Sequence, residues 1–99
     1  MTTENNFAML LERAFVDLVV GRVKARGWKK GEFAAMVWPG DTPKAAAARW
    51  TAIRSKASNT GKPQGVQISD AQRMAEALGE DLSYLMALAK EQARQHAGQ

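Results

Sequence analysis

The sequence predicts an all-α protein of about five helices that form a single domain over residues 1–99. Two observations carry this prediction. Apolar residues recur three and four positions apart through most of the chain, and no credible strand pattern or internal repeat is present. The helical stretches are also separated by Gly, Pro and polar residues of the kinds that begin and end helices.

The first predicted helix runs from about Asn6 to Arg26, and Gly27 is its expected C-terminal stop. Arg13 and Asp17 lie on its polar strip at i,i+4 spacing and are expected to pair. Two nearly opposite apolar stripes mean that this helix needs cover on more than one side. We expect the second cover to be the C-terminal helix or another subunit. The stripes contain Phe7, Leu11, Ala14, Leu18 and Ala25, and Met9, Val16, Val20 and Val23.

A short second helix over about Lys30–Val37 leads through a turn into the best-marked helix of the chain. Pro39 disfavours helical geometry at Trp38, so the second helix should stop there. Thr42 is the expected N-cap of the third helix, and Pro43 takes the first helical position, where its missing N–H costs nothing. The helix-turn-helix then spans about 30–57. The residues expected to be buried are Phe33, Ala34 and Val37 in the second helix, and Ala46, Trp50, Ile53 and Ala57 in the third.

A polar loop over residues 58–65 precedes two further predicted helices. Ser69 and Gln72 fit a capping box at the start of the fourth helix, and Gly79 is its expected end. Asp81 can cap the fifth helix, and the tail from about 92 to 99 is expected to fray. The residues expected to be buried are Ala71, Met74, Ala75 and Leu78, followed by Leu82, Leu85, Met86 and Ala89.

Basic residues are concentrated in the middle of the chain. Residues 22–62 hold ten basic and two acidic residues, a net charge of +8, whereas residues 1–21 and 63–99 each carry −2, giving the total of +4. A basic bias often serves only solubility, but its concentration in one segment indicates a polyanionic partner.

Composition also bounds the chemistry. The chain has no cysteine, which excludes disulfides, zinc–thiolate sites and thiol nucleophiles. No apolar run approaches the roughly 20 residues of a membrane span, and no leader pattern is recognised, so we expect a cytoplasmic protein. No nucleophile–base constellation, metal-ligand spacing or Gly-rich phosphate loop is present. We therefore expect no enzyme activity, no cofactor and no metal.

The third helix carries the candidate functional residues on the side opposite its apolar face. The side chains of this outer face are mostly small and are flanked by cations, an arrangement that suits close docking into a DNA groove. The alternative is a solvated face whose alanines serve helix propensity. The candidates for base contacts are Lys44, Ala48, Arg49 and Thr51; those for phosphate contacts are Lys29, Lys30, Arg54, Lys56, Lys62 and Gln64.

The three tryptophans admit two interpretations. They can be stacking platforms for single-stranded nucleic acid, or they can be core residues. Trp50 lies on the apolar face of the third helix, and Trp28 follows a helix stop, which favours the core for both. Trp38 is the least constrained. The single histidine, His96, lies in the polar tail and is expected to be solvated.

Two stretches resemble the phage-repressor family of helix-turn-helix domains (Cro-like, or XRE). Residues 27–34 (GWKKGEFA) are similar to the exit of that family's first helix and the start of its second, and residues 68–79 (ISDAQRMAEALG) to its fourth helix. The resemblance covers about 18–88. It departs from the family in a longer link between the second and third helices, and in Arg54 near the place of a common glutamate.

The resemblance implies a lambda-repressor-like fold that binds operator DNA, usually as a homodimer. We therefore expect a sequence-specific regulator of transcription that binds double-stranded DNA through its third helix, such as a repressor. The alternative is a protein-interaction module, an antitoxin of a toxin–antitoxin pair or an adaptor, that uses the apolar first helix.

Overall fold

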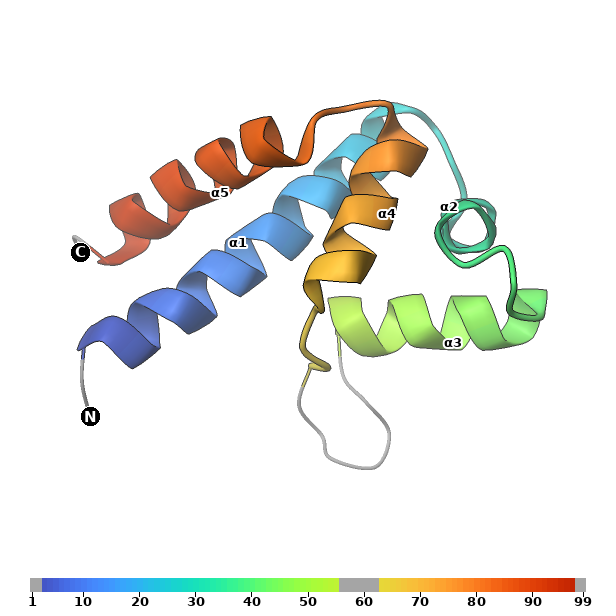
Figure 1. Ribbon diagram of the computed structural model, residues 1–99, viewed down its shortest axis with the longest axis horizontal. Coiled ribbons are helices and arrows are strands. Elements are labelled where there is room, and N and C mark those ends of the chain that lie inside the picture. Colours follow the sequence, from blue (N-terminus) through green and yellow to red (C-terminus); the bar gives the residue numbers. More distant parts are fainter. Residues whose placement is uncertain (1–2, 56–62, 98–99) are drawn as a thin grey trace.

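The computed structural model describes residues 3–55 and 63–97, with side chains from Phe7 onward. It contains five α-helices: α1 (Thr3–Ala25), α2 (Lys30–Val37), α3 (Pro43–Arg54), α4 (Ile68–Leu78) and α5 (Leu82–Ala97). No strand occurs within these ranges. The all-α prediction with about five helices is therefore confirmed (Figure 1).

Helices α1 and α5 form one side of the molecule, where they run antiparallel along each other (Figure 1). Leu85, Ala89 and Ala93 of α5 are fully buried, so α5 covers one apolar side of α1. This is one of the two covers that the sequence allowed. The predicted fraying from residue 92 is wrong as far as Ala97, because the helix continues to that residue and Ala93 gives it a buried anchor.

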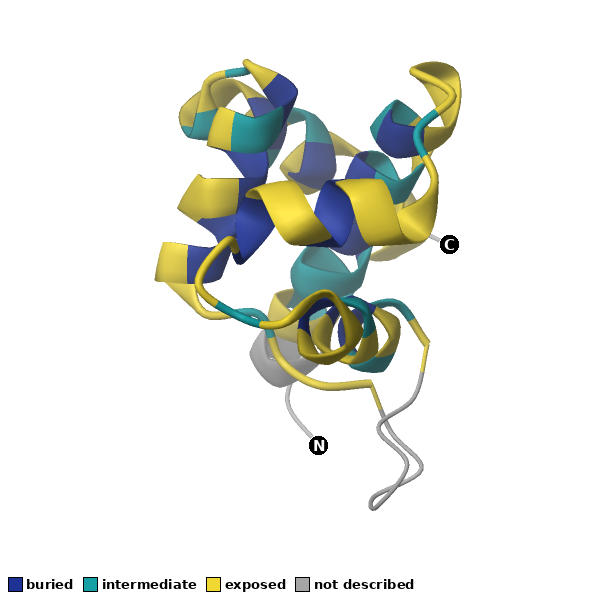
Figure 2. Ribbon diagram, turned by 90° about the vertical axis from the view of Figure 1, so that its right-hand side faces the viewer, coloured by how far each residue is buried: buried dark blue, intermediate teal, exposed yellow. Residues whose placement is uncertain are grey.

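Helices α2, α3 and α4 form the other side and contain the largest buried side chains. The Phe33 and Trp50 rings meet edge to face with centroids 5.1 Å apart, and Trp28 stacks on Phe33 at 6.3 Å. Trp38 and Trp50 are buried and Trp28 is half-buried, so the tryptophans belong to the core and not to a stacking platform. Figure 2 shows α2 and α3 with both buried and exposed segments.

Two helices end at glycines in the left-handed conformation. Gly27 and Gly79 have φ of 71° and 68°, and both predicted stops are confirmed. At Gly79, its N–H donates to Glu76 O and the next N–H, of Glu80, donates to Ala75 O, each at 3.0 Å. This paired arrangement satisfies carbonyls that the end of a helix leaves free.

The beginnings of α4 and α5 differ in their caps. The helix α4 begins at Ile68 after Gln67, which makes no side-chain cap bond, so the predicted Ser69 cap is wrong. Asp81 does cap α5, since its carboxylate accepts the Tyr84 N–H at 3.1 Å. Hydrogen bonds from the Ser83 hydroxyl and the Tyr84 N–H lower the pKa of the Asp81 carboxyl.

Ion pairs also join the C-terminal end of α1 to the turn between α4 and α5. Glu80 accepts from Arg22 Nε at 3.0 Å and lies 3.5 Å from Arg26 Nη2. The Arg26 guanidinium additionally donates to the Leu78 carbonyl and lies over the Trp28 ring. Two of the basic residues counted in the central segment therefore hold the end of α1 against the α4–α5 turn.

Two glycines with equal space around them should respond oppositely to alanine. No atom comes within 4 Å of a Cβ built at either Gly21 or Gly79, so only backbone conformation differs. Gly79→Ala should lower the free energy of unfolding by about 1–2 kcal/mol, because its left-handed φ strains alanine. Gly21→Ala, inside α1, should raise it by about 0.5–1 kcal/mol. Urea unfolding followed by circular dichroism measures both, and a shift in the same direction would contradict the assignment.

Candidate nucleic-acid interface

The helix α3 is held with one face inward and the other outward. Ala46, Trp50 and Ile53 are buried to 1% exposure or less. Because a helix turns by about 100° per residue, the residues between these anchors point away from the core. The predicted buried face is confirmed for these three residues, and Ala57 lies outside the described residues.

The beginning of α3 is fixed by its cap and by its neighbours. Thr42 Oγ1 accepts the Ala45 N–H at 3.1 Å, and Pro43 occupies the first turn, as predicted. The turn before it is locked to α4, because the buried Trp38 indole N–H donates to Asp70 Oδ1 at 3.1 Å. The α2–α3 turn is thus anchored on both sides.

The outward face of α3 has the predicted composition. Lys44, Ala48, Thr51 and Ser55 are all exposed. The side chains in the middle of this face are small, and the long, flexible side chain of Lys44 lies near its N-terminal end. A helix with such a face can approach another surface closely, which a row of bulky side chains would prevent.

The two arginines of α3 are held against the protein. Arg49 Nη2 donates to Asp41 at 3.0 Å, and its guanidinium lies 5.3 Å from the centre of the Trp38 ring. Arg54 lies 5.7 Å from the Trp50 ring centre and donates to Thr51 Oγ1 at 3.2 Å. Both guanidiniums therefore have partners within the protein, along the edges of the outward face.

The remaining phosphate candidates flank α3. Lys29 and Lys30 are exposed at the beginning of α2, and Gln64 is exposed after the loop. The Lys29 N–H donates to Glu32 Oε1 at 2.8 Å, so a carboxylate already occupies part of that helix terminus. Lys56 and Lys62 lie outside the described residues. Residues 29–55 hold five basic and two acidic residues, a net charge of +3.

Two residues important for this surface were not identified from the sequence. Asp70 is buried, and its spacing before Met74 and Leu78 places it on the apolar stripe of α4, which is a signal that sequence reasoning can use. Arg13 does not pair with Asp17 within the described residues. It donates instead to the Ile53 carbonyl at 2.7 Å, a contact across 40 residues that no local pattern indicates.

Within the described ranges, neither a metal-binding cluster nor a membrane-spanning helix is present. No three His, Asp or Glu side chains there gather closely enough to hold a metal ion. None of the helices described is both long and apolar enough to span a bilayer. Searches with family models, against curated proteins and against solved structures found no match to the chain.

The cap at Thr42 can be tested by its contribution to stability. Thr42→Ala should lower the free energy of unfolding by about 1 kcal/mol, because the Ala45 N–H loses its acceptor. Ser69→Ala is the matched control, since Ser69 lies exposed in the first turn of α4 and caps no helix. The control should change stability by less than about 0.5 kcal/mol. Equal losses in chemical denaturation would show that Thr42 does not act as the cap.

Proposed function

We propose that this chain is a sequence-specific regulator of transcription that binds double-stranded DNA with α3 in the major groove. The observation that carries the proposal is the outward face of α3. Its middle consists of small side chains and its edges carry cations, while the opposite face of the helix is buried. This is the arrangement that a recognition helix needs. The resemblance to phage-repressor domains supports the same function.

Three exposed residues spaced along the outward face of α3 suit contacts with base edges. Lys44 lies nearest the N-terminal end and can donate to guanine acceptors in the major groove. Ala48 and the methyl group of Thr51 can contact a thymine methyl group. Arg49 is bound to Asp41, so we assign it to the groove edge together with Arg54.

Lysines beside α3 supply the contacts with phosphate. Lys29 and Lys30 lie at the beginning of α2, and Gln64 follows the loop. Phosphate contacts set the position of a protein on the duplex without reading its sequence directly. In this proposal, the lysines and arginines hold the protein at the duplex while Lys44, Ala48 and Thr51 read it.

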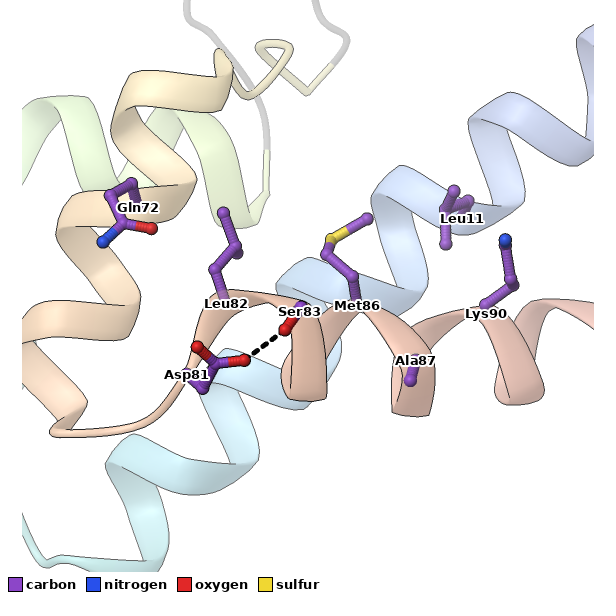
Figure 3. Close-up of a pocket in the computed structure, with 8 residues that line it drawn as sticks. All are labelled: Leu11, Gln72, Asp81, Leu82, Ser83, Met86, Ala87 and Lys90. Atoms are coloured by element: carbon purple, nitrogen blue, oxygen red, sulfur yellow. Dashed lines mark hydrogen bonds between the residues drawn. The ribbon is translucent and has the colours of Figure 1, made fainter.

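We further propose that the chain acts as a homodimer. Val16 and Val23 on the second apolar stripe of α1 are buried within the chain, but Met9 on the same stripe remains 69% exposed. A hollow of about 740 Å³ runs beside α1 and is lined by Leu11 together with Leu82 and Met86 of α5 (Figure 3). A second copy packed over Met9 or over the hollow, which lie on different sides of α1, would bury apolar surface, and the dimer would carry two recognition helices.

The DNA-binding proposal predicts a selectable operator with a steep salt dependence. Selection from a random duplex library should enrich a palindrome with half-sites about one helical turn apart. Affinity for that duplex should fall by roughly 10³–10⁵ between 50 and 200 mM salt if six to ten phosphates are contacted. Lys44→Glu combined with Arg49→Glu should abolish binding without unfolding the protein.

The matched control for that charge reversal is Arg94→Glu, an exposed residue near the C-terminal end of α5, which lies on the opposite side of the molecule from α3 (Figure 1). It should leave most of the affinity intact. Fluorescence anisotropy of the labelled duplex, with circular dichroism as the check on folding, measures all three proteins. A flat salt response, or binding by the double variant as tight as by the original chain, would refute the proposal.

Sedimentation of the chain at micromolar concentration tests the homodimer. A dimer is expected because the side of α1 that carries the exposed Met9 side chain favours burial. Met9→Asp should shift the equilibrium toward monomer if this side forms the contact. A monomer at these concentrations would contradict the homodimer. A monomer that also binds no duplex would favour the alternative, an antitoxin or adaptor in which this side of α1 binds a different protein.

A further inference from the structure

The C-terminal end of α3 is held by one side chain from α1. Arg13 Nη1 donates to the Ile53 carbonyl at 2.7 Å, and its Nη2 donates to the Gln64 carbonyl at 3.3 Å. The two carbonyls lie on either side of the segment 56–62. One guanidinium therefore joins the last turn of α3 to the chain that leads into α4.

The preceding residue of α1 completes the arrangement. Glu12 Oε1 accepts from Arg13 Nη2 at 3.2 Å, and its Oε2 accepts the Val66 N–H at 3.1 Å. The Gln64 N–H donates directly to the Ala52 carbonyl of α3 at 2.8 Å. We call these contacts of Glu12 and Arg13 with residues 53 and 64–66 the Glu12–Arg13 clamp.

The clamp occupies a helix end that lacks a glycine stop. Ser55 follows α3 with φ −124° and ψ −85°, whereas α1 and α4 end at glycines with positive φ. The last carbonyls of a helix have no partners within the helix, and a cation placed there also interacts favourably with the helix dipole. At α3, the guanidinium of Arg13 supplies both effects from a different helix.

The chemistry of the clamp requires arginine. A guanidinium is a rigid planar fork that can donate to two acceptors in fixed directions, whereas an ammonium is a single point of charge. The side chains of Arg13 and Glu12 are 30% and 38% exposed, so water competes with these bonds only in part. The clamp thus gives the last turn of α3 a defined position relative to α1.

We propose that Glu12 and Arg13 are positioning residues for the DNA-binding surface. They set the place of the last turn of α3 and of residues 64–66, and so the direction in which Thr51, Ser55 and Gln64 face. Neither residue needs to touch DNA. This inference rests on the proposed function, because it concerns how accurately α3 and Gln64 are presented to a duplex.

The test compares Arg13→Met with Arg94→Met on α5, a matched control whose arginine is exposed near the end of the chain. With the duplex selected by the original chain, Arg13→Met should weaken binding by about tenfold or more, as expected when a charged hydrogen bond is lost. The slope of affinity against salt should stay unchanged, whereas loss of a phosphate contact would reduce it by about 1. Arg94→Met should change neither quantity.

Two milder variants separate positioning from simple unfolding. Arg13→Lys keeps the charge without the fork and should fall between the original chain and Arg13→Met. Glu12→Gln keeps an acceptor for the Val66 N–H and should weaken binding by only a few fold. Affinity unchanged in Arg13→Met, or a salt slope reduced by about 1, would overturn the positioning role.

Amide hydrogen exchange distinguishes failure of this inference from failure of the proposed function. Exchange at Gln64 and Val66 should be faster in Arg13→Met than in Arg94→Met, because the Val66 N–H donates to Glu12 and the Gln64 N–H donates to Ala52 beside the Arg13 contacts. If the original chain binds no duplex, the DNA-binding proposal fails, and with it the role in presenting α3 to DNA. In that case, faster exchange in Arg13→Met would still show that Arg13 holds residues 64–66 in place. Unchanged exchange would show that it does not.

Discussion

The direction in which α3 faces depends above all on its largest buried anchor, Trp50, whose ring meets the Phe33 ring with centroids 5.1 Å apart. Both side chains are almost completely buried, so rotating α3 about its axis would expose a large aromatic surface to water. Such a rotation is strongly disfavoured because apolar burial is the main favourable term in folding. The exposure of Lys44 and Thr51 is therefore a consequence of core packing and not an independent feature.

The basic residues of the middle of the chain divide into two groups with different effects. Arg22 and Arg26 pair with Glu80, and they stabilise the end of α1 against the α4–α5 turn. The lysines at positions 29, 30 and 44 are exposed. A count of charge along the sequence treats these groups alike, although Glu80 offsets one of the two arginine charges while the exposed lysines keep theirs in full. The lysines near α2 and α3 therefore add more, residue for residue, to the field that an approaching polyanion meets.

Much of the fold could be predicted because its signals are local. The conformation of one backbone position favours glycine at a helix end or proline after Thr42. A short stretch of sequence is therefore enough to predict either feature. The prediction of a Ser69 cap was wrong because a Ser-x-x-Gln pattern also fits inside the first turn of a helix, and the N-cap of α4 is Gln67, two residues earlier. Contacts such as that of Arg13 with the Ile53 carbonyl were not predictable, because they depend on how α1 lies against α3. The sequence could therefore predict which residues form the outward face of α3, but not which groups the charged residues around it contact.

The state of the arginines bears on how such a face can recognise DNA. Arg49 is fixed by Asp41 and Trp38, and Arg54 lies over Trp50, so both lose much of their side-chain freedom when the protein folds. Ordering a long side chain at an interface costs about 0.5–1.5 kcal/mol, a term that an already ordered arginine largely avoids. Lys44 retains its freedom and must be ordered on binding. The arginines therefore favour a defined fit along the edges of α3, while discrimination between bases falls to Lys44 and the small residues behind it.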